Sequence, residues 1–425
     1  MAFHKNQQNN NPIRVGKYIS TVGIRTISLS ILLFLLCSLN AFKKTFGELS
    51  MGILYGICII FIIQSIPYLF HRYTQWTYNW VRFFFIYIVL IGIISPLAFW
   101  YQPLIDTIHT SIGFWGIWVI FFFLFEYKYT LKEIENAIII SSIIYFILYM
   151  YNFTNHYSNM NLMLGEELTT NNIRLFWGSS DLSICTFFIS LNRIVYDNKN
   201  KYFITLFLSL LIITFLQTRQ IYLWIGLISI IYTYKRLNFK LFAKFFYIIL
   251  ISLPILIPIA NGIIVKSEQQ QMQLKINKEE YIRIREYKYY FNNVNKTHLQ
   301  NIIGNGKPQD GSSFYNQIYE KAPGPEADVG YAGIYFYWGI IGLLFFAYLL
   351  YKVIAEKIPE KYYWIKLAII NLFLYNIFSF SLRYCFMSLF IYCIFLLQRR
   401  KFIIKKLYHE RYKHNNSLLQ FTNKY

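Results

Sequence analysis

The sequence predicts an all-α polytopic membrane protein with about twelve transmembrane helices. Apolar and aromatic residues make up 56% of the 425 residues and charged residues only 14%, whereas soluble domains are nearer a quarter charged. The apolar residues also lie in long unbroken runs. Because one crossing takes roughly 20 residues of helix, a dozen crossings need about 240 residues. This composition excludes a soluble multi-domain enzyme, a secreted disulfide scaffold and a disordered chain.

Charged interruptions divide the apolar residues into candidate crossings of one integral-membrane domain, residues 1–425. The twelve candidates lie near 24–42, 50–70, 83–101, 111–126, 136–152, 176–194, 202–217, 220–234, 242–264, 329–350, 363–380 and 384–398. Only Gln217–Gln220 separates the seventh from the eighth, so one broken helix is the alternative for that pair. The first run has no small-residue cleavage site behind it and predicts a retained anchor.

Lysine and arginine in the short loops predict the orientation. Basic residues concentrate in alternate loops and in the tail at 399–425, which places both termini in the cytoplasm. The predicted outer loops carry few, namely Lys43, Lys44, Arg174, Arg219 and Arg383. This asymmetry also accounts for the formal charge of +21. The basic residues form no single patch or binding motif, so nucleic acid is not an expected partner.

The long hydrophilic segment 266–328 is then a large loop on the outside, which we expect to be partly helical. Asn277 and Glu280 have the spacing of a capping box before a helix over Tyr281–Phe291. A second helix is expected over Thr297–Ile303, ending at Gly304. Glycine and proline residues then predict irregular loop over 305–328.

Arginines on the predicted outer face are the main candidate binding residues. Arg174, Arg219 and Arg383 lie at helix ends where the topological bias disfavours them, and Arg283 and Arg285 lie on the expected loop helix. A guanidinium presents a planar fork of donors that suits phosphate oxygens, so several together would bind a diphosphate. The alternative is that each contacts lipid headgroups or pairs with a nearby acid. Nucleotide-binding and zinc motifs are absent from the sequence, and no cofactor or metal is expected.

Three further outer residues are candidates. Asp181 lies within the sixth run, and a carboxylate there is either functional or paired with a neighbour such as Arg174. Asp328 directly precedes the tenth run. His298 is expected to be a surface histidine more often than a base, and Glu166–Glu167 to be solvated in a polar loop.

Four stretches occur in a recognisable order around the large loop. They are Arg174-Leu-Phe-Trp-Gly178-Ser-Ser-Asp181, Thr218-Arg219-Gln220, Arg283 to Tyr290 with Gly304-Asn-Gly306, and Asp328-Val-Gly-Tyr331 continuing to Trp338-Gly339-Ile-Ile-Gly342. Over roughly 170–350, this arrangement resembles the bacterial O-antigen polymerase and O-antigen ligase superfamily of membrane glycosyltransferases. In that family the Gly-x-x-Gly packs against the next helix. Ligases commonly carry His-Asn where this chain has Asp328-Val329, which favours a polymerase.

The resemblance implies a GT-C-like enzyme of the bacterial inner membrane that joins undecaprenyl-diphosphate-linked repeat units at the periplasmic face. Because placed arginines can stabilise the charge on a departing diphosphate without a metal, we expect Arg219, Arg174 and one of Arg283 or Arg285 to bind it, and Asp328 to orient or deprotonate the acceptor. A chain-length regulator is a candidate partner beside the membrane lipids. An O-antigen ligase, or a flippase or other transporter of lipid-linked oligosaccharide, stays open as the alternative.

Overall fold

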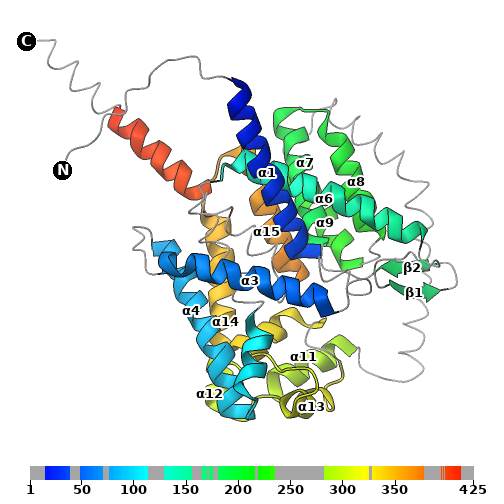
Figure 1. The fold of residues 1–425 in the computed structure, drawn as a ribbon, viewed down its shortest axis with the longest axis vertical. Helices are drawn as coiled ribbons and strands as arrows, with labels where there is room; N and C mark the ends of the chain where they lie inside the picture. Colours follow the sequence, from blue (N-terminus) through cyan, green and yellow to red (C-terminus); the bar gives the residue numbers. More distant parts are fainter. Residues whose placement is uncertain are drawn as a thin grey trace, which may run out of the picture.

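The computed structural model describes residues 15–38, 48–69, 76–112, 129–155, 165–169, 172–175, 180–215, 219–234, 282–324, 328–377, 394, 396 and 398–412. Most of this part of the chain is helical (Figure 1). The first helices are α1 (Val15–Ser38), α3 (Glu48–Leu69), α4 (Trp76–Trp100), α6 (Leu131–Thr154), α7 (Ser180–Asp197), α8 (Tyr202–Phe215) and α9 (Arg219–Tyr234). They are followed by α11 (Ile282–Asn292), α12 (His298–Ile303), α13 (Ser313–Tyr319), α14 (Gly330–Ala355), the 3₁₀ turn η3 (Glu360–Tyr362) and α15 (Trp364–Tyr375).

Among the described residues, three helical stretches are long and apolar enough to cross a membrane, namely Arg82–Trp100, Leu131–Asn152 and Gly330–Ala355. Shorter apolar helices occur at Gly23–Leu35, Tyr55–Gln64, Tyr202–Thr214 and Ile221–Tyr234. The helical character predicted from the sequence is therefore confirmed, while the number of about twelve crossings stays a prediction. The candidates at 242–264, nearly all of 111–126 and most of 384–398 lie outside the described residues.

The helices pack in a continuous series. Helix α1 packs on α6, α6 on α7 and α8, α7 on α15, and α15 on both α9 and α14, while α14 also contacts α4. Large apolar side chains such as Phe83, Ile63 and Leu344 remain exposed on these helices. A bilayer would cover such side chains and keep them from water.

A short β-hairpin is the exception to the helical fold. Strands β1 (Gly165–Thr169) and β2 (Asn172–Leu175) pair antiparallel, with Glu166 opposite Arg174. Arg174 is therefore a strand residue, and α7 begins only at Ser180. A polar loop was expected around Glu166 and Glu167 because this part of the segment is polar.

The seventh and eighth candidate crossings are two separate helices, α8 and α9. The hydroxyl of Tyr222 on α9 donates a hydrogen bond to the carbonyl of Thr214 on α8. Residues eight apart in one straight helix are separated by about 12 Å along its axis, which is too far for this bond. One straight, continuous helix over both runs is therefore excluded, whereas the alternative considered for this pair, one broken helix, stays open because residues 216–218 lie outside the described residues.

Helix α14 is interrupted at Gly339, which has φ +62°. A Cβ at this position would lie 2.2 Å from the carbonyl oxygen of Ile302. The hydroxyl of Tyr87 on α4 bridges the break by donating to the carbonyls of Ile303 (2.9 Å) and Trp338 (2.8 Å). Gly339 thus packs against the end of α12, and the expectation that it packs against the next helix was wrong.

The turn Gly304–Gly306 fills the space beside this break. The backbone N–H of Asn305 donates to the carbonyl of Phe336 (2.8 Å), and that of Gly306 donates to Tyr337 (3.1 Å). An interruption of α14 leaves these carbonyls without their normal helical donors, and the turn satisfies them. Both glycines have positive φ, 88° and 72°, as a turn requires. The predicted turn and the predicted end of the helix at Gly304 are therefore confirmed.

Candidate functional site

Two predicted site residues are brought together at one end of the bundle. Arg283 on α11 and Asp328, two residues before α14, form an ion pair with Nη1 and Oδ2 2.5 Å apart. The Arg283 side chain is 25% exposed and the Asp328 side chain 41% exposed. The pair is therefore accessible from solvent, and its two members come from sequence positions 45 residues apart.

Glu286 is the third member of this group, and the sequence analysis did not single it out. Its Oε2 lies 3.2 Å from Arg283 Nη1, and its side chain is only 1% exposed. Burial raises the pKa of Glu286, and the guanidinium of Arg283 opposes that shift. A carboxylate one helical turn after an arginine suggests only an exposed i,i+3 pair. No local sequence signal reveals that the rest of the fold covers this one.

Helix α11 is fixed over the bundle end by tyrosine hydroxyls. Tyr287 donates to the carbonyl of Ile377 (2.5 Å), just after α15. Tyr290 donates to the carbonyl of Gly324 (3.0 Å), and a Cβ at Gly324 would lie 1.9 Å from Glu286 Oε1. These contacts hold α11 across the N-terminal end of α14 and the C-terminal end of α15, so Arg283 meets Asp328 through tertiary structure and not through local sequence.

Helices α12 and α13 pack against the end of α4 at the same end of the bundle as Arg283 and Asp328. The carbonyl Oδ1 of the buried Asn305 side chain accepts hydrogen bonds from Trp100 Nε1 and from Gln300 Nε2, both at 3.0 Å. The Trp100 ring stacks on Phe314 with centroids 4.5 Å apart. Lys296 Nζ lies 4.7 Å from the centre of the Trp100 ring. Residues 293–324 thus form a packed cap that contains helices α12 and α13. The irregular loop expected over 305–328 was therefore wrong at Ser313–Tyr319, which is helical.

The remaining predicted residues on described helices are not members of the ion pair. Arg285 is half-buried on α11, two residues after Arg283 and so on another face of the helix, and its charge acts to lower the pKa of Glu286. His298 is exposed at the first position of α12, so the expected surface histidine is confirmed. Asp181 lies in the first turn of α7, at the end of a helix and not deep inside a crossing.

Arg174 and Arg219 are placed by their backbones. Arg174 lies in β2 and Arg219 is the first residue of α9. The side chains of both, and the whole of Arg383, lie outside the described residues. The convergence of these arginines with Arg283 therefore stays a prediction.

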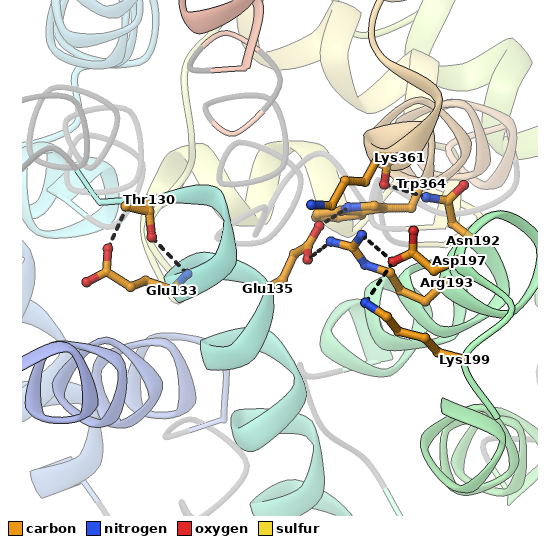
Figure 2. A network of polar contacts seen from close by, with 9 residues as sticks. All are labelled: Thr130, Glu133, Glu135, Asn192, Arg193, Asp197, Lys199, Lys361 and Trp364. Atoms are coloured by element: carbon orange, nitrogen blue, oxygen red, sulfur yellow. Dashed lines mark hydrogen bonds and ion pairs between the residues drawn. The ribbon is translucent and has the colours of Figure 1, made fainter. Parts of the chain in front are cut away.

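A second polar cluster lies at the opposite end of α15, about 17 Å along the helix axis. Glu135 on α6 forms an ion pair with Arg193 on α7 and accepts a hydrogen bond from Trp364 Nε1 (2.8 Å). Arg193 also pairs with Asp197 at 3.0 Å, and Asp197 with Lys199 at 3.2 Å. Figure 2 shows these side chains converging from α6, α7 and the start of α15. Because every charge of this cluster has a partner, we assign it to stability.

No family of known proteins is matched by this chain. Comparison with protein-family models, with curated proteins and with solved structures gave no significant similarity. In the residues that the structure describes, histidine, cysteine and acidic side chains do not gather in groups that could hold a metal ion. The candidate site is the group of Arg283, Asp328 and Glu286 joined by ion pairs, called the outer triad below after the loop that the sequence predicts to lie outside.

Proposed function

We propose that this chain is a polysaccharide polymerase of the bacterial inner membrane, acting on O-antigen, capsule or exopolysaccharide units. It joins undecaprenyl-diphosphate-linked repeat units at the periplasmic face, in a GT-C-like membrane domain with about twelve crossings and cytoplasmic termini. The observation that carries the proposal is the outer triad. It combines a guanidinium with a partly exposed carboxylate at one end of the helix bundle, on a packed cap.

The chemistry needs two functions that these groups supply. An acceptor hydroxyl attacks the anomeric carbon of the donor glycan while the bond from that carbon to the diphosphate oxygen breaks. Asp328 accepts the hydroxyl proton, and undecaprenyl diphosphate leaves with the electron pair. Fixed arginines stabilise the charge that develops on the diphosphate. Arg283 contacts Asp328 and Glu286 through the same nitrogen, Nη1. In our proposal the other guanidinium nitrogens of Arg283 bind a diphosphate oxygen. Arg219 and Arg174 complete the diphosphate site.

Reconstitution tests this proposal directly. Purified full-length protein in proteoliposomes, given undecaprenyl-diphosphate-linked oligosaccharide, should release undecaprenyl diphosphate and form products of two or more repeat units. The matched variant is Asp328→Asn, which keeps the shape of the side chain but removes the base, and it should form less product than the wild-type protein. Lack of any product from the wild-type protein with a verified substrate would contradict the proposal.

Gene deletion separates the alternatives. Loss of a polymerase leaves single repeat units on the surface acceptor. Loss of a ligase leaves long lipid-linked chains without transfer to lipid A-core. Loss of a flippase leaves lipid-linked units on the cytoplasmic side of the membrane. Only the first outcome agrees with our proposal.

A further inference from the structure

The C-terminal helical segment 398–412 has a basic and apolar surface that the described residues leave uncovered. It appears in red in Figure 1, extending beyond the other helices. Residues 399–412 contain six lysines and arginines and one acidic residue. Ile404, Leu407 and Tyr408 are 45%, 54% and 75% exposed. Their i, i+3, i+4 spacing places these three side chains on one face of the helix.

The start of this segment is fixed to the end of a candidate membrane-spanning helix. Arg399 Nη2 lies 2.9 Å from Oε1 of Glu356, the residue that caps the C-terminus of α14. Gln398 is buried at the same end. The ion pair therefore holds the segment where α14 ends. If α14 spans the bilayer, this point lies at the level of the lipid headgroups.

We propose that segment 398–412 is an interfacial helix that binds anionic phospholipid headgroups. Ile404, Leu407 and Tyr408 enter the boundary between headgroups and acyl chains, while Lys401, Lys405 and Arg411 contact lipid phosphates. All three of these basic residues are exposed. An apolar face with tyrosine, flanked by flexible basic side chains, has the chemistry of helices that lie in a membrane surface. The proposal requires that the chain lie in a bilayer and does not depend on the polymerase chemistry.

Hydrogen exchange on the full-length protein tests this proposal. An exposed helix of this length is only marginally stable by itself, so its amides should exchange quickly in nanodiscs of phosphatidylcholine. Addition of phosphatidylglycerol to the nanodiscs should slow exchange across 398–412, and high salt should reverse the effect. Each lysine near an anionic surface is worth about fivefold in binding constant. The double variant Lys401→Gln/Lys405→Gln should therefore weaken docking about 25-fold.

The matched control is Lys132→Gln/Lys357→Gln, which removes two exposed lysines from other helix ends and should leave exchange in the segment unchanged. Exchange in α6 and α14 reports whether each variant is folded. Equal exchange with and without phosphatidylglycerol would overturn the proposal. So would protection that Lys401→Gln/Lys405→Gln leaves intact, or protection produced by inorganic phosphate alone in phosphatidylcholine nanodiscs.

Discussion

Arg283 Nη1 lies 2.5 Å from Asp328 Oδ2 and connects helix α11 to the residues that lead into α14. The same nitrogen contacts Glu286, so one guanidinium faces two carboxylates. One carboxylate is buried and the other is accessible. In our proposal this difference separates their roles, with the buried Glu286 orienting Arg283 and the accessible Asp328 contacting the substrate.

We predict that Arg283→Lys and Asp328→Asn each reduce product formation in proteoliposomes by about a hundredfold, because a positioned charge or base is lost. The combined variant should be little worse than either single variant, because the two side chains act as a unit. Membrane abundance should stay normal, since a pair this exposed contributes only about 0.2–1 kcal/mol to stability.

Exposed Lys321 on the same cap is the control for this pair, and Lys321→Gln should retain full activity. Strictly additive losses in the double variant would show that Arg283 and Asp328 act independently. Full activity in both single variants would remove the outer triad from the site.

We predict that Glu286→Ala lowers the free energy of unfolding by about 1–3 kcal/mol, because it removes a buried partner of Arg283. Thermal unfolding in detergent, followed by tryptophan fluorescence, measures the change. Glu320→Ala on α13 removes an exposed glutamate and should stay within about 0.5 kcal/mol of the wild type. Equal effects of the two substitutions would contradict the buried position of Glu286.

Glu286 also predicts a pH dependence. Burial raises its pKa above the ordinary value of 4.5. The folded state therefore holds this proton more tightly than the unfolded state, and the free energy of unfolding falls as pH rises from 4.5 through the folded-state pKa. Glu286→Gln should remove this contribution, which denaturant titrations over that range would measure. If the free energy of unfolding changes with pH equally in the variant and in the wild type, the pH dependence belongs to another group.

The second polar cluster predicts a stability effect without a catalytic one. Glu135→Ala leaves the buried guanidinium of Arg193 without its main partner and should cost about 3–5 kcal/mol. Glu135→Leu/Arg193→Met removes both charges and should cost less. Glu133→Ala is the control on the same helix, since its partner Arg25 is exposed and the lost capping box is worth only about 1 kcal/mol. A larger loss from the Glu135→Leu/Arg193→Met protein than from Glu135→Ala would contradict this assignment.

The sequence predicts the helices of this protein better than its site. Apolar runs correctly locate α4, α6 and α14, and the glycine turn at 304–306 follows from local conformational preference. The hairpin at 165–175 was missed because β1 is almost wholly polar and β2, in which Ile173 and Leu175 alternate with polar residues, is only four residues long. Burial of Glu286 and its meeting with Asp328 depend on how α11 crosses the bundle. Tyr287 and Tyr290 fix that crossing through contacts with residues 90 and 34 positions away, and no local pattern encodes such contacts.

The break in α14 gives the sharpest structural prediction. Gly339→Ala combines a left-handed backbone (φ +62°) with a Cβ only 2.2 Å from the carbonyl oxygen of Ile302. The site cannot relax without moving α12, and with it the turn that satisfies the carbonyls of α14. We expect a loss of about 3 kcal/mol or more in stability and rapid proteolysis within 293–324. Gly226→Ala on α9 is the control, because a Cβ there meets nothing within 4 Å. This substitution should be neutral or stabilise the helix by up to about 1 kcal/mol. If the Gly339→Ala protein melts like the wild type and residues 293–324 resist protease, the packed cap does not depend on the helix break.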